Sequence, residues 1–237
     1  MGDPLLDPQQ TRREYASETR LLSRASIYAG SEGPDTNDLV VELVGGLDPR
    51  SILEIGCGPG ILADRLRAEL GLPVTAIDIS ERMVQLAQAR GIEAQLGDVQ
   101  QIPFPDASFD LAIAAWMLYH VPDLHRALGE VKRILRPAGR FVAVTNSARH
   151  LEEMWRLIGW KGYRLSFNAE NGAAILRRHF DRVERRDVLG TVTFSDADMV
   201  RGYVGATIKA RELVDTVPEL PAPLVARRHN AIFIATK

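Results

Sequence analysis

The segment Leu53–Gly60, which reads LEIGCGPG, is the part of the sequence best suited to bind a ligand. It follows a short apolar run and precedes a helical pattern, so its glycines let the backbone approach a ligand at a helix N-terminus. A dinucleotide fingerprint starting at Gly56 needs a third glycine at position 61, where this chain has Ile61. The segment contains no lysine and therefore differs from a phosphate-binding P-loop.

Glu54 precedes the first glycine by two residues, and its charge narrows the class of ligand. A carboxylate repels a pyrophosphate, whereas it favours a ligand that carries an ammonium and a sulfonium group. The pattern E-x-G-x-G-x-G therefore favours S-adenosylmethionine over NAD, FAD or ATP. Cys57 is interpreted as a small spacer between the glycines. Because no base is placed near it in the sequence, a role as a nucleophile is not expected.

Two further acidic residues extend the pattern. Asp78 ends the second apolar run, 18 residues after Gly60 and close to the ~20 expected for an acid that binds ribose. Asp98 follows the third run, in GDVQQIPF. With these motifs, and with PFPDASFDLAI and MLYHVPD further on, roughly residues 40–146 resemble the class I S-adenosylmethionine-dependent methyltransferases.

The resemblance implies a set of cofactor contacts. Glu54 and the glycines would lie beside the methionine part, Asp78 would hold the ribose hydroxyls, and Asp98 would bond the adenine amino group. Arg24 or Tyr28 is a candidate for the cofactor carboxylate, although a solvated helix face also explains Arg24. The full set of implied cofactor residues is Arg24, Tyr28, Glu54, Gly56, Cys57, Gly58, Gly60, Asp78, Ile79, Met83, Asp98, Val99 and Ala115.

The residues that act on the methyl acceptor are harder to identify, because methyl transfer depends mainly on positioning and on exclusion of water. His120 is a candidate general base, since imidazole titrates near neutrality. Packing at a helix start or contact with the cofactor are alternative roles. Aromatic residues predicted to wall the acceptor pocket are Tyr15, Trp116, Tyr119, Trp155 and Tyr203, with Tyr163 as a further member. No His, Asp and Glu cluster has metal-ligand spacing, so no metal is expected.

Apolar runs alternate with helical patterns from Ser51 to Thr145, which predicts a doubly wound α/β fold of the Rossmann type. The sheet is expected to be mostly parallel, with residues 181–194 and 230–235 pairing antiparallel at one edge. We expect one domain, with an N-terminal helical lid over residues 1–39, a cofactor-binding core over 40–146 and substrate cap elements over 147–237. Residues 8–28 are expected to form one amphipathic helix, and residues 148–161 another.

Composition and charge limit the classes of partner that the protein is expected to have. Residues 1–145 carry 14 Lys and Arg against 20 Asp and Glu, whereas residues 146–237 carry 15 against 11. Net charge is −2, which gives no general attraction to DNA or RNA. No leader or membrane span is evident, so the prediction is a cytoplasmic monomer or homodimer that methylates a small-molecule metabolite, with S-adenosylhomocysteine as the second product. Methylation of RNA or protein, suggested by the basic last third, and a non-catalytic cofactor-binding module remain alternatives.

Overall fold

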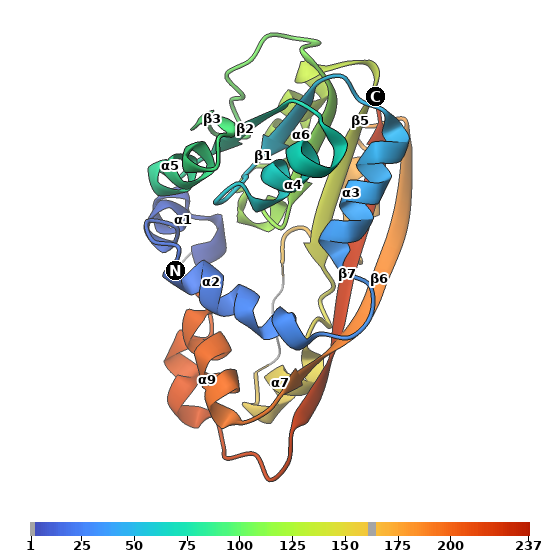
Figure 1. The fold of residues 1–237 in the computed structure, drawn as a ribbon. Helices are drawn as coiled ribbons and strands as arrows, with labels where there is room; N and C mark the ends of the chain where they lie inside the picture. The colour runs from blue at the N-terminus through green and yellow to red at the C-terminus, as the bar shows by residue number, and fades with distance from the viewer. Residues whose placement is uncertain (1–2, 161–164) are drawn as a thin grey trace.

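A seven-stranded sheet in the order β3-β2-β1-β4-β5-β7-β6 organises the protein (Figure 1). The structure is a computed structural model that describes residues 3–160 and 165–237. In chain order the elements are η1 (Pro4–Leu6), α1 (Pro8–Glu14), α2 (Thr19–Ser26), η2 (Ile27–Gly30), α3 (Thr36–Leu47), β1 (Ile52–Ile55), α4 (Ile61–Leu70), β2 (Val74–Asp78), α5 (Glu81–Ala89), β3 (Glu93–Leu96), β4 (Phe109–Ala115), η3 (Leu118–His120), α6 (Leu124–Ile134), β5 (Leu135–Asn146), α7 (Glu152–Leu157), α8 (Gly172–Leu176), β6 (Arg182–Phe194), α9 (Ala197–Ala206), η4 (Arg211–Thr216) and β7 (Leu224–Thr236).

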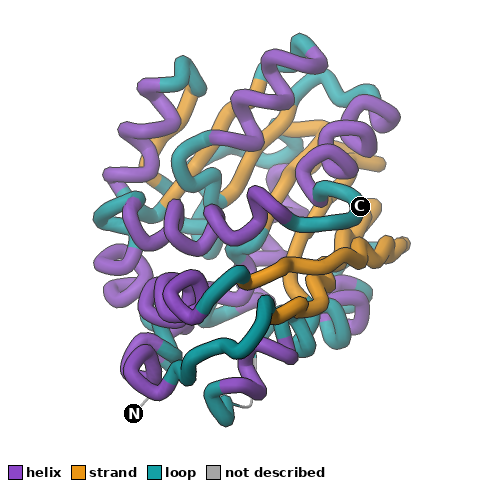
Figure 2. The backbone as a smooth tube through the Cα atoms, turned by 60° about the horizontal axis from the view of Figure 1, so that its bottom comes forward, coloured by secondary structure: helices purple, strands orange, loops and turns teal. Residues whose placement is uncertain are grey.

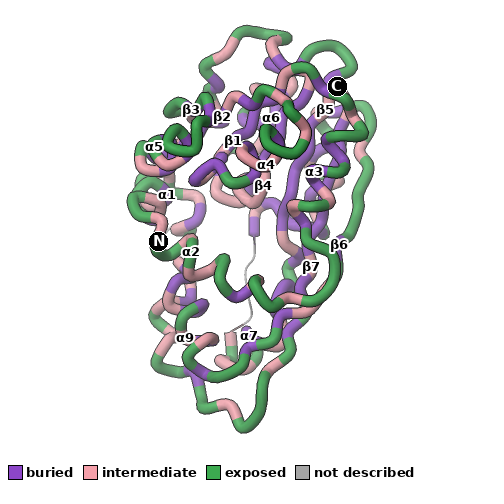
Figure 3. Tube along the Cα trace, in the orientation of Figure 1, coloured by how far each residue is buried: buried purple, intermediate pink, exposed green. Residues whose placement is uncertain are grey.

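The predicted fold class is confirmed. Strands β1 to β5 pair in parallel, and β7 pairs antiparallel with both β5 and β6. Helices α3, α4 and α5 pack on one face of the sheet, and α6 and α8 pack on the other. Both faces of the parallel strands are therefore covered, which explains why β4 is almost wholly apolar. Figure 3 shows the buried residues running along these strands.

Capping side chains fix the starts of three helices. Asp35, Ser80 and Asp123 each accept a backbone N–H of the first turn of α3, α5 and α6. Because the glycine segment and Ser80 begin their helices directly after β1 and β2, the loops between them stay short. The carboxyl ends of the two strands consequently face one shared space.

The predicted single helix over residues 8–28 is wrong. It is split into α1 and α2 by the residues after Glu14, and η2 continues from α2. Tyr15 ends α1 with its backbone carbonyl accepting a hydrogen bond from Ser80 Oγ at 2.7 Å, a tertiary contact that a continuous helix could not make. Figure 2 shows the separate helical segments of this lid.

Strand β7 is longer than the predicted 230–235, whereas β6 starts one residue after the predicted 181–194 and ends with it. Together they form a two-stranded extension. Strand β5 pairs with β7 only from Asn230 to Thr236, whereas β6 pairs with β7 along its whole length from Leu224. The parts of β6 and β7 beyond β5 run past the main sheet and carry a third hydrophobic cluster with α7 and α9. Helix α7 covers only Glu152–Leu157 of the predicted 148–161, because Leu151 takes a left-handed conformation and precedes it.

Gly60 has a packing role that a side chain would disrupt. Its φ is +80°, and an added Cβ would lie 2.9 Å from Ala87 Cβ in α5. We predict that Gly60→Ala lowers the free energy of unfolding by about 2–3 kcal/mol, from overpacking and a left-handed backbone. Urea denaturation measures this change.

Gly129→Ala is the matched control for Gly60→Ala. Gly129 lies inside α6 with no atom within 4 Å of an added Cβ, so alanine should stabilise the protein by up to about 1 kcal/mol. Equal effects of the two substitutions would contradict the packing role of Gly60.

Candidate cofactor and acceptor site

A cavity of about 340 Å³ lies at the carboxyl ends of β1, β2 and β4, beneath α1 and α2. Its core wall comprises Glu54, Ile55, Gly56, Cys57, Gly58, Pro59, Ile61, Leu62, Asp78, Ile79, Gly97, Asp98, Val99, Gln100, Ala115, Trp116, Met117, Tyr119, His120, Val121 and Pro122. Its lid wall comprises Pro8, Thr11, Tyr15, Leu21, Leu22, Arg24 and Ala25, and Asn37 completes the lining. The lid and the core therefore enclose one space, in the position where doubly wound sheets bind ligands.

Glu54 is the most deeply buried acid of the cavity. Its side-chain Oε2 atom has no hydrogen-bond partner within the described part of the chain. Burial raises the pKa of Glu54 to about 8, and the neighbouring charge of Asp78 adds to this rise. The free protein therefore holds Glu54 protonated at neutral pH, and a cationic ligand group would favour its ionised form.

Asp78 is held by backbone N–H groups at the end of β2. Oδ2 accepts from Gly58 N at 2.9 Å, and Oδ1 accepts from Ser80 N at 2.9 Å. Burial raises the pKa of Asp78, and these N–H groups partly offset the rise. The glycine segment is thus tied to the acid of the next strand, and one contact shapes both sides of the cavity.

Gly56 and Gly58 have different structural roles in the segment. Gly56 has φ +66°, and an added Cβ would lie 2.8 Å from Met117 Cβ, so only glycine fits between β1 and the residues after β4. Gly58 has φ +54° and only Leu21 Cδ2 of the lid near its added Cβ, at 3.9 Å. Gly56 therefore meets a packing requirement, whereas Gly58 leaves room beside the lid.

The lid contributes Tyr15 and Arg24 to the cavity. Tyr15 Oη contacts His120 Nε2 at 3.1 Å, and Arg24 Nη2 donates to Tyr15 Oη at 3.5 Å. Arg24 also donates from Nη1 to the backbone carbonyl of Ala206 at 2.6 Å, at the end of α9. Its side chain is 21% exposed, so Arg24 does not belong to a solvated helix face.

His120 faces the cavity from η3. Burial lowers its pKa to about 4, and the positive charge of Arg24 acts in the same direction. The imidazole is therefore neutral at physiological pH, the form that can accept a proton, and in this closed arrangement the Tyr15 hydroxyl already contacts Nε2.

Five predicted site residues lie outside this cavity. Gly60 packs on α5, and Met83 is fully buried in that helix. Tyr28 Oη contacts His150 Nε2 at 2.8 Å. Trp155 and Tyr203 pack against each other with ring centroids 5.7 Å apart, beside a second cavity of about 20 Å³. Their roles toward cofactor or acceptor stay predictions, and Tyr163 lies outside the described residues.

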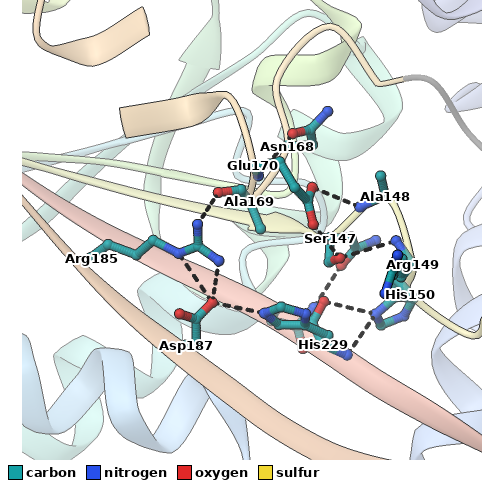
Figure 4. A network of polar contacts seen from close by, with 12 residues as sticks. Ser147, Ala148, Arg149, His150, Asn168, Ala169, Glu170, Arg185, Asp187 and His229 are labelled. Carbon is teal, nitrogen blue, oxygen red and sulfur yellow. Dashed lines mark hydrogen bonds and ion pairs between the residues drawn. The ribbon is translucent and has the colours of Figure 1, made fainter. Parts of the chain in front are cut away.

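A polar network anchors the cap elements behind Tyr28 (Figure 4). Glu170 accepts from Ser147 Oγ at 2.6 Å and from Ala148 N at 2.9 Å. On the neighbouring strands, Asp187 pairs with Arg185 and with His229 Nε2. The network joins the loop after β5 to β6 and β7, which fixes the base of the cap relative to the cofactor end of the sheet.

Sequence reasoning missed several residues of the cavity. Leu21, Leu22 and Ala25 line it from α2, and Gln100 lines it beside Asp98. The apolar residues carried no chemical signal and sat in a helix that was predicted as continuous. Glu14 contacts three arginines. The alternation of acidic and basic residues over 12–24 could have indicated such ion pairs, but it does not show that Glu14 is buried.

Comparisons with known proteins agree with this geometry. Residues 53–143 match a family model described as a methyltransferase domain. A 27-O-demethylrifamycin SV methyltransferase from Amycolatopsis mediterranei is 37% identical over 116 residues, which cover 44% of this chain and 43% of that protein. The chain thus spans less than half the length of this curated relative. The match lies in the part of the chain that holds the cofactor motifs.

Solved structures share the fold over nearly the whole chain. The [4+2]-cyclase SpnF superposes with a TM-score of 0.63 at 20% identity, covering 97% of this chain and 95% of that one. A Haemonchus contortus phosphoethanolamine N-methyltransferase 2, solved with S-adenosyl-L-methionine, has a TM-score of 0.62 at 17% identity and covers 93% and 57%. Residues 53–143 thus match a methyltransferase domain, and the solved structures share its fold, which agrees with the family predicted from the motifs.

The neutral state of His120 can be tested by titration. We predict that its imidazole proton shifts stay constant in NMR spectra from pH 8 to pH 5 and change only near pH 4. Tyr15→Ala opens the buried contact, so the pKa of His120 should rise toward the usual 6.5.

Tyr28→Ala is the matched control, because Tyr28 contacts His150 and not His120. It should leave the His120 titration unchanged. A wild-type His120 midpoint at or above pH 6 would show that the closed lid does not bury this imidazole.

Proposed function

We propose that the protein is an S-adenosylmethionine-dependent methyltransferase that methylates O, N or C of a small-molecule acceptor held between lid and core. The observation that carries the proposal is the cavity itself. Three acids, Glu54, Asp78 and Asp98, line its core wall at the ends of successive strands. The rifamycin-type relative, by its name, acts on a small molecule.

The residues present fit this cofactor. The unpaired Glu54 Oε2 suits an ammonium group, Asp78 offers carboxylate oxygens for ribose hydroxyls, and Asp98 lines the same cavity as the proposed partner of the adenine amino group. Ile79 and Val99 add apolar surface to the same cavity wall. When bound, the cofactor supplies an electrophilic methyl group on a sulfonium.

The chain's own contribution is to enclose and orient. Leu21, Leu22 and Ala25 of the lid add apolar surface to the cavity wall, and a ligand bound between lid and core would displace water from this surface. His120 is the group placed to accept a proton from a hydroxyl or amine acceptor, after the Tyr15 hydroxyl gives up its contact with Nε2. Its low pKa makes it a weak base, so its role is greatest for an acceptor that is itself acidic.

The basic last third gives less support to an RNA acceptor than its composition suggests. Arg185 is paired with Asp187, and Arg182 is paired with Glu184. These pairs reduce the positive field that RNA binding requires. No helix of the described residues is long and apolar enough to cross a membrane. The monomeric or dimeric state, the cytoplasmic location and the single-domain organisation stay predictions.

The proposal is tested by following a labelled methyl group. The protein is incubated with methyl-tritiated S-adenosylmethionine and an extract of the producing cell, which is then separated into small molecules, RNA and protein. Label in the small-molecule fraction supports the proposal, and label in RNA or protein supports a macromolecular acceptor. Cofactor binding with no transfer supports a non-catalytic module, an outcome made relevant by the cyclase that shares this fold.

Asp78→Asn is the inactivating control for this assay. Loss of its charge should weaken binding of S-adenosylhomocysteine by about tenfold or more. Glu93→Gln, an exposed acid on the adjacent β3, should leave binding unchanged. Unchanged binding in Asp78→Asn would contradict the assigned cofactor site.

The raised pKa of Glu54 gives a second prediction. Below pH 8 the free protein holds this carboxyl protonated, and a ligand ammonium favours the ionised form, so binding should release a proton. Affinity for S-adenosylhomocysteine should therefore rise with pH, by at most about tenfold per unit, and level off near pH 8.

Calorimetry at pH 7 in buffers of different ionisation enthalpy counts the released protons. Glu54→Gln should abolish the release, whereas Glu93→Gln should preserve it. Proton uptake by the wild type would place the ligand ammonium away from Glu54.

A further inference from the structure

Glu14 is the most unusual charged residue outside the core wall. Its side chain is 4% exposed and forms ion pairs with Arg20 at 3.1 Å, Arg24 at 3.2 Å and Arg211 at 2.7 Å. Burial opposes its charge, but the Arg211 hydrogen bond and the three guanidinium charges lower its pKa overall. Glu14 is therefore a permanent buried anion at neutral pH.

The three arginines come from different parts of the fold. Arg20 and Arg24 belong to α2, and Arg211 begins η4 in the C-terminal cap. Glu14 ends α1, so its carboxylate ties both lid helices to the cap. Arg24 adds a further tie through the carbonyl of Ala206.

The charges of this cluster do not cancel. Three guanidinium groups face one carboxylate, which leaves positive charge in excess. Among the described residues that line the cavity, Arg24 is the only lysine or arginine. Its Nη1 atom donates to Glu14 and to Ala206. Within the described part of the chain, Nη2 makes a long 3.5 Å hydrogen bond to Tyr15 Oη, and the guanidinium lies over the Tyr15 ring. Arg24 thus has N–H donors that can bind a ligand in the cavity, while its Nη1 atom is fixed by Glu14 and Ala206.

We propose that Glu14 is a positioning residue, whose buried carboxylate holds Arg24 at the cavity wall so that its guanidinium binds a ligand carboxylate. The inference rests on the proposed function. The carboxylate belongs either to the methionine part of the cofactor or to the acceptor. Glu14 itself touches no ligand, and it acts through Arg24.

Binding of two nucleosides shows whether the carboxylate bound by Arg24 belongs to the cofactor or to the acceptor. S-Adenosylhomocysteine carries a carboxylate, whereas 5′-methylthioadenosine has the same nucleoside and thioether without the amino-acid part. If the cofactor is the source, Glu14→Gln and Arg24→Met should each weaken S-adenosylhomocysteine about tenfold or more, and change 5′-methylthioadenosine less than twofold. A merely structural defect would weaken both nucleosides alike.

If the acceptor is the source, the ratio of the two nucleoside affinities stays at its wild-type value. Benzoate binding to the protein saturated with S-adenosylhomocysteine, followed by NMR line broadening, should then be lost in both variants. Variants that keep both the nucleoside ratio and benzoate binding overturn the proposal.

Glu18→Gln is the matched control. Glu18 lies on the same lid segment and pairs with Arg82 of α5 at 2.7 Å, but this pair is only half-buried and neither residue lines the cavity. It should leave the nucleoside ratio unchanged. A ratio that shifts equally in Glu18→Gln would assign the effect to lid docking in general and would also overturn the specific role of Glu14.

Limited proteolysis tests, without any ligand, whether Glu14 holds the lid helices in place. Arg12 and Arg13 are exposed beside Glu14, and trypsin should cleave there at least several times faster in Glu14→Gln than in Glu18→Gln, with the circular dichroism spectrum unchanged. If wild-type protein binds neither nucleoside, the proposed function fails. Equal cleavage rates in Glu14→Gln and Glu18→Gln would overturn the positioning role of Glu14. The two failures are therefore distinguishable.

Discussion

The burial of two acids at adjacent strand ends is the constraint on which the site depends. Glu54 lies on β1 and Asp78 ends β2, and both are almost inaccessible to solvent. A buried carboxyl group is costly unless it is hydrogen-bonded or neutralised. Asp78 meets the requirement with N–H groups of the glycine segment and the α5 cap, whereas Glu54 keeps one oxygen unpaired. The glycine segment and the start of α5 thus supply the partners of Asp78, whereas the unpaired Glu54 oxygen is the basis for the proposed cationic ligand group.

The lid can be understood from the same electrostatics. The core wall is acidic and the lid brings one guanidinium, so a ligand with a cation and an anion at separate ends fits between them. Contacts on both sides hold the lid in place. Ser80 Oγ and Arg82 bind it to α5, and Arg211 and the carbonyl of Ala206 bind it to the cap. The lid is therefore shared between the two halves of the molecule.

The sequence was most informative where local chemistry decides the structure. The alternation of apolar runs and helical patterns predicted the parallel strands because strands such as β4 are buried on both faces. The caps at Ser80 and Asp123 also depend only on neighbouring residues. Asp78 and Asp98 reach the cavity as expected because strand ends place them there. The break after Glu14 and the placement of Tyr28 away from the cavity depend on distant partners, Ser80 and His150, which no local pattern encodes. Strand β7 was underestimated because its first half, LVARRH, pairs with β6 alone and stays polar.

The two-stranded extension of β6 and β7 has a consequence for how such proteins diversify. The chain leaves the extension at Phe194 and returns at Leu224, and the intervening residues include α9 and η4. This insert is bounded by two paired positions, Phe194 and Leu224. Replacing this insert would leave every strand pair of the parallel sheet unchanged, but a related protein without Arg211 and the Ala206 carbonyl would have to hold its lid by other contacts.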